Sequence, residues 1–433
     1  MKKIYTCLFF VDLLITTLTA QDSIYYRQCI SDLSSRDFHG RGYAYKGDSI
    51  AADYIAQVFK TYPLEKWTPD YYQHFTIGMN VFDGEVEVDF GQEFEQPRLF
   101  EDLQIMAYSC AMQGQYKVKP LSPDNVIAAS KKKSNKYKKL FLLIDLSEFD
   151  AKDSIQQKKQ KQVLEIVHAN GLNAKGYILV SDKLMGWPLS LGRVDAKHVC
   201  INVSRSYLTK IPKKVRVKLD RQRINNYQTQ NVCGYIKGKT YPDSFFVFTA
   251  HYDHLGHFGK DYIFYGANDN ASGTAFIMDL ARYYSKAENQ PDYSIAFLAL
   301  SCEEVGLLGS FHFVENSYIP ISNIKTLINF DMVGTGEEGI TLVCGHAFPY
   351  EFEKFAQLNT QHQYLNKVVP RHASNNSDHY PFYEKGVQAF FIYAMGKSGR
   401  YHHTSDTLEI LSLGGYTGLF KLITAYINLY NQP

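Results

Sequence analysis

Four near-continuous runs of apolar residues dominate the pattern of the second half of the chain. They are SFFVFTA (244–250), SIAFLAL (294–300), KTLINF (325–330) and VQAFFIYA (387–394). Runs of this length without polar alternation are typical of strands buried on both faces of a largely parallel sheet. Between the first two, SGTAFIMDLARYYSK (272–286) has helical periodicity, with Ser272 as its expected N-cap. The pattern therefore predicts an α/β fold with a largely parallel sheet.

The first half of the chain has two patterns of its own. An amphipathic helix is predicted over residues 51–59, with Asp48 or Ser49 as its cap. Further along, two apolar strands flank a helix that ends at a glycine. These elements are KKLFLLIDL (138–146), the helix 153–171 and AKGYILVSD (174–182). They form a β-α-β unit, which predicts a smaller α/β lobe separate from the main sheet.

The first 20 residues have the pattern of a signal peptide. Lys2 and Lys3 precede an apolar stretch and Ala20 offers a small residue for cleavage, although Asp12 interrupts the stretch. A short membrane anchor is the alternative interpretation. No other stretch approaches the roughly 18 uninterrupted apolar residues of a membrane span. We therefore predict a protein exported to the periplasm or secreted, without stable insertion into a membrane.

The composition is that of an ordinary globular protein and mainly argues against certain partners and sites. Of 433 residues, 45% are hydrophobic and 21% charged, and the net charge is +2, which gives no indication of a nucleic-acid partner. The basic run SKKKSNKYKK (130–139) has no companion motif and is interpreted as solvated surface. Six of the seven cysteines follow the signal segment, scattered and without a CxxC pair. A cysteine zinc site is therefore not expected, whereas export permits disulfides.

Side chains able to bind a metal ion follow each of the four apolar runs. They are His251 and Asp253, Asp269 in GANDNASG, Glu303 and Glu304, Asp331, and finally His402 and His403 in YHHTSDT. In open α/β sheets the site lies outside the carboxyl ends of the strands, so these groups are expected at one edge. Imidazoles and carboxylates without thiolates suit zinc. Too many carboxylates converge for one tetrahedral ion, so two ions sharing a carboxylate are predicted.

The adjacent carboxylates of Glu303 and Glu304 fit such a site. Two like charges side by side repel each other and cost solvation energy when they are buried, so another group must offset that cost. A metal ion bound by one glutamate does so, while the other glutamate accepts the proton of the attacking water.

Taken together, these motifs resemble those of metallopeptidase family twenty-eight. The motifs are HYDHLG, GANDNASG, CEEVGLLGS, NFDMVG and YHHTSDT, joined by the N-terminal LSSRDFHGRG. The family comprises double-zinc exopeptidases, among them bacterial leucyl aminopeptidases and glutamate carboxypeptidase. The resemblance implies a three-layer α/β/α zinc exopeptidase domain with a largely parallel mixed sheet. After the predicted signal peptide (1–20), it divides the chain into an N-terminal part of the catalytic domain (21–100), an inserted protease-associated-like lobe (101–210) and the rest of the catalytic domain (211–433).

The resemblance also implies roles for individual residues. The implied zinc ligands are His251 and Asp331 for one ion, Glu304 and His402 for the other, and Asp269 for both. Glu303 corresponds to the general base and Asp253 to the acid that orients its histidine ligand. Tyr401 corresponds to a tyrosine that stabilises the oxyanion in some members. The Asp269–Asn270 peptide bond is expected to be cis, as in relatives.

The function that the resemblance implies is that of an exported zinc aminopeptidase. It would hydrolyse N-terminal residues from peptides through a water held between two Zn²⁺ ions per chain. A single-zinc glutaminyl cyclase-like acyltransferase and a catalytically silent receptor-like protein are the alternatives; the complete ligand set argues against the second. His403 is a candidate for substrate binding, and Asp378 either binds substrate or holds its loop in place. The sequence makes no prediction of the oligomeric state.

Overall fold

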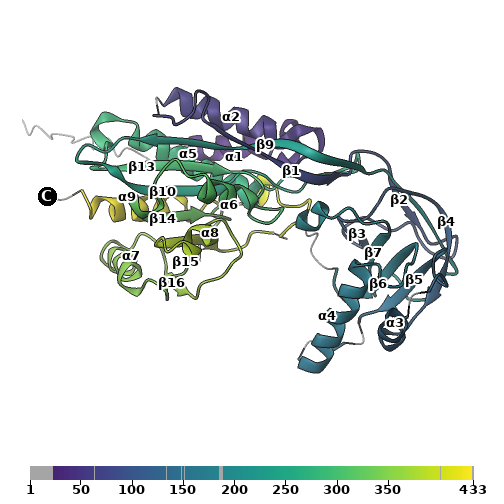
Figure 1. The fold of residues 1–433 in the computed structure, drawn as a ribbon. Coiled ribbons are helices and arrows are strands. Elements are labelled where there is room, and N and C mark those ends of the chain that lie inside the picture. The colour runs from purple at the N-terminus through teal and green to yellow at the C-terminus, as the bar shows by residue number, and fades with distance from the viewer. Residues whose placement is uncertain are drawn as a thin grey trace, which may run out of the picture.

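The described part of the chain forms two large sheets, each with its own helices, and one small two-stranded sheet (Figure 1). This computed structural model describes residues 23–62, 64–132, 134–147, 149–150, 152–184, 189–399 and 401–431. The predicted signal peptide, residues 1–20, lies outside the described residues. In the described part of the chain, no helix combines the length and the apolar character needed to cross a membrane.

The larger sheet has eight strands in the order β1-β9-β13-β10-β14-β17-β15-β16. Their bounds are β1 Tyr72–Val81, β9 Gln222–Ile236, β10 Tyr241–His251, β13 Tyr293–Leu300, β14 Ile324–Phe330, β15 Gly339–Val343, β16 Val368–Arg371 and β17 Ala389–Met395. The central strands β13, β10, β14 and β17 are parallel, whereas β9 and β15 join them antiparallel. These four central strands are the four apolar runs of the sequence. The prediction of a largely parallel mixed sheet is confirmed.

Helices cover both faces of this sheet and complete a three-layer domain. One face carries α1 (Ser23–Leu33), α2 (Gly47–Thr61), α5 (Gly273–Tyr284), α7 (Pro349–His362) and α9 (Tyr416–Asn428), and the other carries α6 (Leu308–Glu315) and α8 (His379–Glu384). Figure 1 shows α1, α2 and α5 together along one side of the sheet. Side chains alternate between faces along β10: Phe246 and Phe248 pack under the first set of helices, Phe245 and Val247 under the second.

The smaller sheet has seven strands in the order β2-β8-β4-β5-β6-β7-β3. Their bounds are β2 Val86–Asp89, β3 Leu103–Ile105, β4 Met112–Pro120, β5 Leu140–Asp145, β6 Gly176–Ser181, β7 Val199–Ser204 and β8 Lys214–Leu219. Strands β4 to β7 are parallel, and α3 (Pro123–Ser130) and α4 (Ser154–His168) pack on one of their faces. Strands β2 and β8 lie beyond the predicted lobe range of 101–210, on either side of it.

The other face of the smaller sheet packs against the main domain next to the loops that follow β10 and β13. Its apolar side chains share one core with Leu255 and with the hairpin β11 (Gly256–Phe258) and β12 (Tyr262–Phe264). The ring of Phe100 lies edge-on to Phe258 and Phe264, with ring centroids 5.3 and 4.8 Å apart. The hairpin thereby packs against the lobe, and β12 leads directly into the loop that carries Asp269.

The predicted cap of helix α2 is wrong. The helix begins at Gly47, and the preceding residue, Lys46, makes no side-chain cap hydrogen bond. Asp48 lies inside the first turn and is fully buried. Its carboxylate accepts hydrogen bonds from the hydroxyl groups of Tyr227 and Thr229 on strand β9. The short polar side chain at the start of the helix therefore joins the helix to the sheet.

Ser272 stands at the predicted N-cap position of helix α5, but its side chain makes no capping hydrogen bond. A single π-helical turn, η4 (Ala267–Ser272), precedes the helix. The Ser272 hydroxyl donates to the carbonyl of Asn268 at 2.7 Å and accepts the backbone N–H of Val333 at 3.0 Å. The hydroxyl is thus used to join the Asp269 loop to the loop after β14. The remaining short helical segments are η1 (Arg36–Arg41), η2 (Ala44–Lys46), η3 (Leu189–Arg193), η5 (Ala287–Asn289), η6 (Ile321–Asn323) and η7 (Leu408–Ile410).

Candidate metal centre

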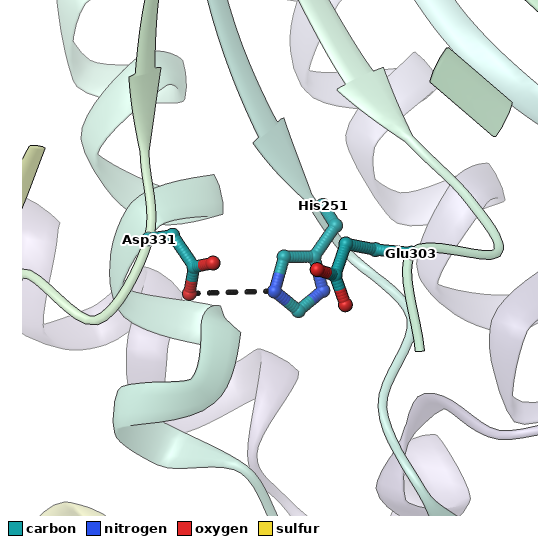
Figure 2. Close-up of side chains that lie close together, drawn as sticks. All are labelled: His251, Glu303 and Asp331. Carbon is teal, nitrogen blue, oxygen red and sulfur yellow. Dashed lines mark ion pairs between the residues drawn. The ribbon is translucent and has the colours of Figure 1, made fainter. Parts of the chain in front are cut away.

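The predicted site residues lie where the parallel strands end. Strand β10 ends at His251, β13 is followed by Glu303 and Glu304, and β14 is followed by Asp331. Since the carboxyl ends of neighbouring parallel strands meet at one edge of a sheet, these side chains converge there. Figure 2 shows His251, Glu303 and Asp331 gathered at the ends of their strands.

The first group of ligand-type side chains is built around His251. Its Nε2 atom lies 3.4 Å from Asp331 Oδ1, the contact dashed in Figure 2, and 3.4 Å from Asp269 Oδ1. Glu303 completes this group: one ligand atom from each of His251, Glu303 and Asp331 lies within 4.8 Å of the others. His251 and Asp331 are buried, and Glu303 is partly exposed. The group can hold one cation.

The second group lies on the other side of Asp269. Asp269 Oδ2 is 3.4 Å from His402 Nε2, and that nitrogen is 3.0 Å from Glu304 Oε2. His254, which sequence reasoning did not select, also belongs here, with its Nδ1 atom 2.7 Å from Glu304 Oε1. Asp269 therefore presents one oxygen to each group. This is the arrangement expected of a carboxylate shared by two ions.

These residues fit a pair of zinc ions. Zinc bonds of 2.0–2.2 Å place neighbouring ligands of a tetrahedral ion about 3.3 Å apart. The nitrogen–oxygen distances of 3.0 to 3.4 Å around His251 and His402 are close to that spacing. Asp269 Oδ2 and His402 Nε2 are buried and have no hydrogen-bond partner among the described residues. Buried polar atoms without partners are rare, and a shared cation would satisfy both of them.

Asp253 supports the site mainly through the backbone of the glutamates. Its carboxylate oxygens accept the backbone N–H groups of Glu303 at 3.1 Å and Glu304 at 3.4 Å, and the hydroxyl of Tyr43 at 2.9 Å. His251 Nδ1 lies closer to the Asp253 carbonyl oxygen, at 3.1 Å, than to its carboxylate, at 3.8 Å. The side chain of Asp253 therefore fixes the loop after β13, while its backbone orients the histidine.

The loop that carries Asp269 is held by Asp406. The Asp406 carboxylate accepts the backbone N–H groups of Asn268 at 2.9 Å and of Asp269 at 3.0 Å. The Asp269–Asn270 peptide bond is cis, as the resemblance predicted. The side chain of Asn270 donates to the carbonyl of Phe330 at 2.9 Å, which joins this loop to the end of β14. The backbone at Asp269, the carboxylate proposed to be shared, is therefore held both by Asp406 and by the end of β14.

Arg41 is a further support that sequence reasoning missed. Its guanidinium is fully buried, and within the described residues all its hydrogen bonds go to backbone carbonyl oxygens, at 2.6 to 3.3 Å. The acceptors belong to Leu33, Tyr252, Tyr265, Gly266 and Asp269. Arg41 thus ties the strand end after His251 to the Asp269 loop. The only sequence signal is its place between two glycines in HGRG, which allow close backbone packing.

The two adjacent glutamates have pKa values shifted in opposite directions. Burial favours the neutral form of Glu304, but the charge of His402 and the hydrogen bond from His254 hold its pKa at about 2. Burial raises the pKa of Glu303 well above its usual range, and the negative charge of Glu304 adds to that rise against the attraction of His251. Paired carboxylates in such unlike environments are typical of one ligand and one proton acceptor.

Asp331 and Asp378 are linked to the site through serine hydroxyl groups. Ser377 donates to Asp331 Oδ2 at 2.8 Å, and Ser310 donates to Asp378 Oδ1 at 2.6 Å. Asp378 is fully buried, and its Oδ2 atom has no hydrogen-bond partner among the described residues. Full burial favours the second of the two roles considered for Asp378, that of holding its loop in place.

Tyr401 and His403 lie on either side of His402 in the chain. The ring of Tyr401 stacks on that of His402, with centroids 3.7 Å apart, and 63% of the residue is exposed. His403 instead contacts Glu101 through Nε2 at 3.1 Å and Ser405 through Nδ1 at 2.8 Å. The first position can reach a bound substrate, whereas the second connects the histidine loop to the start of the smaller lobe.

Comparison with protein families finds a match in the second half of the chain. Residues 231–427 match peptidase family M28. The curated relatives include aminopeptidase YwaD from Bacillus subtilis, 30% identical over 278 residues that cover 60% of this chain and 58% of that protein. Leupeptin-inactivating enzyme 1 from Streptomyces exfoliatus is 31% identical over 129 residues, 29% of this chain and 28% of that protein. The matched part thus spans somewhat over half of the first relative and less of the second.

Solved structures share the whole fold. An aminopeptidase from Aneurinibacillus sp. strain AM-1 superimposes with a TM-score of 0.68 and 19% identity, over 96% of this chain and 95% of that one. A zinc aminopeptidase from Bacillus subtilis gives a TM-score of 0.68 and 21% identity, over 95% of each chain. At these identities the similarity is one of fold. It includes both sheets, since nearly the whole of this chain is covered.

Proposed function

Because residues 231–427 of this chain match peptidase family M28, we propose that it is a zinc-dependent exopeptidase, an aminopeptidase that removes N-terminal residues from peptides. The observation that carries the proposal is the pair of ligand groups that meet at Asp269, with Glu303 beside them. The aminopeptidases among the relatives support the choice of reaction. Export to the periplasm or the medium remains part of the proposal, on the N-terminal pattern alone.

The proposed ligands follow the two groups of the site. They are His251 and Asp331 for one ion, Glu304 and His402 for the other, and Asp269 for both. Zinc held by these residues would lower the pKa of a water molecule and polarise the carbonyl group of the substrate. Glu303 accepts the proton of the attacking water and returns it to the leaving amine.

The remaining residues of the site hold these groups in place or contact the substrate. Asp253 fixes the backbone that carries Glu303, so that its carboxylate is presented to the water without reorganisation. Tyr401 is exposed beside His402, and we assign its hydroxyl to the carbonyl oxygen of the substrate, where negative charge develops in the transition state. Both assignments are proposals about this chain.

Purified full-length protein tests this function through metal content and hydrolysis of a panel of aminoacyl-anilides. We expect about two zinc ions per chain, release of the anilide group, loss of activity on chelation and recovery on adding zinc. The N-acetylated anilides serve as the matched substrates and should resist cleavage, because an aminopeptidase requires a free amino group. Hydrolysis that survives chelation, or none on any free-amine substrate, would contradict the proposal. One zinc ion with cyclisation of glutaminyl substrates would identify the cyclase alternative.

A further inference from the structure

A third histidine lies inside the metal centre and has no role among the ligands assigned above. His254 follows His251 by three residues, just after the end of β10, and none of its surface is exposed. Its Nδ1 atom lies 2.7 Å from Glu304 Oε1 and 3.9 Å from Asp269 Oδ2. One ligand atom from each of His254, Asp269 and Glu304 falls within 4.8 Å of the others. The imidazole is therefore either an additional ligand or a hydrogen-bond donor to one.

The distances separate these two roles. Two ligands of one tetrahedral zinc ion lie about 3.3 Å apart. His402 Nε2 fits that spacing to both carboxylates, at 3.0 Å from Glu304 and 3.4 Å from Asp269. His254 Nδ1 is closer than that to Glu304 and farther from Asp269, and 2.7 Å is the length of a charge-assisted hydrogen bond. The geometry is that of a donor to the oxygen of Glu304 that faces away from His402.

The fold sets the imidazole in this position. Gly266 adopts a left-handed backbone conformation, with φ +58°, directly beside the ring. A Cβ atom there would lie 2.4 Å from Cδ2 of His254 and 2.2 Å from the carbonyl oxygen of Asp269. Glycine is therefore needed at 266 both for its backbone angle and for the space that the ring fills. His254 Nε2 is buried without a hydrogen-bond partner among the described residues.

We propose that His254 is a positioning residue: its Nδ1–H group binds Oε1 of Glu304 and thereby commits Oε2 to the ion shared with His402. This inference rests on the two-ion site proposed above. A neutral imidazole with its proton on Nδ1 makes this bond and leaves Nε2 as an acceptor. Without the donor, Oε1 of Glu304 becomes a buried carboxylate oxygen with no partner, and the carboxylate is free to rotate. Groups of this kind typically change metal affinity about 10- to 100-fold.

Three substitutions at the same position separate the donor from the volume of the ring. His254→Asn keeps an N–H donor at the δ position, His254→Gln moves it to the ε position, and His254→Leu removes it. The readout is zinc affinity, measured by titrating the metal-free full-length chain in the presence of a competing chelator. We expect one ion to bind about 10- to 100-fold more weakly in the Leu and Gln variants. The Asn variant should stay within about 3-fold of the wild type.

The control is His198→Leu, which removes an equally buried imidazole from the smaller lobe, where it packs against Tyr108 and Tyr177. It should leave both zinc affinities unchanged. Thermal unfolding of the metal-free variants checks that each is folded, and the Asn variant keeps the test valid if the Leu variant is not. Equal zinc affinities in the wild-type, Asn and Leu proteins would overturn the positioning role of His254 and leave the two-ion site standing. An Asn variant as weak as Leu would overturn it too, because the δ donor would not suffice. A wild type that binds fewer than two ions would overturn the two-ion site, and this inference with it.

Discussion

The side chain of Asp253 binds the backbone of Glu303. One carboxylate oxygen of Asp253 accepts the Glu303 N–H at 3.1 Å, while the other accepts the hydroxyl of Tyr43 at 2.9 Å. The second oxygen also lies 3.4 Å from the N–H of Glu304. The direct contact with His251 is longer, at 3.8 Å. Asp253 therefore fixes the backbone position of both glutamates. It thereby positions Glu303, the proposed proton acceptor, next to Glu304, a proposed ligand.

Replacing Asp253 tests this support. In Asp253→Asn one acceptor oxygen becomes an amide donor, so that either the backbone N–H of the glutamates or the Tyr43 hydroxyl loses its partner. We expect kcat for an aminoacyl-anilide to fall about 10- to 100-fold with a smaller change in KM, because the reacting groups are misplaced while substrate contacts remain. Tyr43→Phe removes only one donor and should have a milder effect in the same direction. An Asn variant with wild-type kcat would contradict this role of Asp253.

Replacing Glu303 separates proton transfer from metal binding. Glu303→Gln keeps the shape of the side chain but cannot accept a proton at the same pKa, so turnover should fall about 10²- to 10⁴-fold. Zinc content should stay at the wild-type level, because the assigned ligands are unchanged. Steady-state rates and metal analysis on the same preparation give both values. Glu315→Gln, on the exposed end of helix α6, is the matched control and should behave as the wild type. Loss of zinc in the Gln variant would make Glu303 a ligand.

The central strands could be predicted because burial on both faces leaves a plain signal. Strands β10, β13, β14 and β17 lie between helices on both faces of the sheet, so most of their residues are apolar. Strand β1 gave no such signal: it pairs only with β9, and exposed or half-exposed positions alternate irregularly along it. The ligands followed from the strand ends, because parallel strands bring their carboxyl ends together whatever the sequence distance between them.

The supports of the site could not be predicted in the same way. Arg41 binds five carbonyl oxygens, and every residue type has a carbonyl, so nothing in the sequence marks its partners. His254 resembles His251 in type and lies in the same motif, and only distance distinguishes a donor to Glu304 from a ligand. Ser272 has the residue type of a helix cap, but its hydroxyl forms hydrogen bonds with Asn268 and with Val333. Val333 lies 61 positions after Ser272 in the chain. Tertiary contacts decided these three cases.

Replacing Arg41 should weaken both the fold and the metal centre. Arg41→Lys keeps the charge but offers three donors without the planar fork, and so leaves buried carbonyl oxygens unpaired. Each hydrogen bond lost from a charged group costs about 1.5–3 kcal/mol, so we expect the free energy of unfolding to fall by about 3 kcal/mol or more. Urea unfolding measures that loss. Zinc content shows whether Asp269 is still positioned to bind metal. Arg36→Lys, an exposed position in the same segment, is the control. Equal unfolding midpoints for the two variants would contradict this role for Arg41.

Asp48 is buried in the first turn of helix α2 and is not one of the assigned ligands. Burial raises its pKa to about 7, although the hydroxyl groups of Tyr227 and Thr229 donate to it and favour the charged form. In an unfolded chain the same carboxyl titrates at about 3.9. Between these two values the native state holds a proton that the unfolded state has released.

The unfolding free energy should therefore fall as pH rises from about 4 to about 7 through Asp48, because stability decreases wherever the native state binds more protons. Each unit of pKa difference corresponds to about 1.4 kcal/mol. Asp48→Asn cannot ionise and lacks this dependence. Urea unfolding of the metal-free proteins at pH 5 and pH 8 should show the variant gaining about 2 kcal/mol or more relative to the wild type at the higher pH. Comparing the two proteins cancels the titration of the site carboxylates and histidines, which both share. A difference between variant and wild type that does not change with pH would show that Asp48 is already ionised in the folded protein at pH 5.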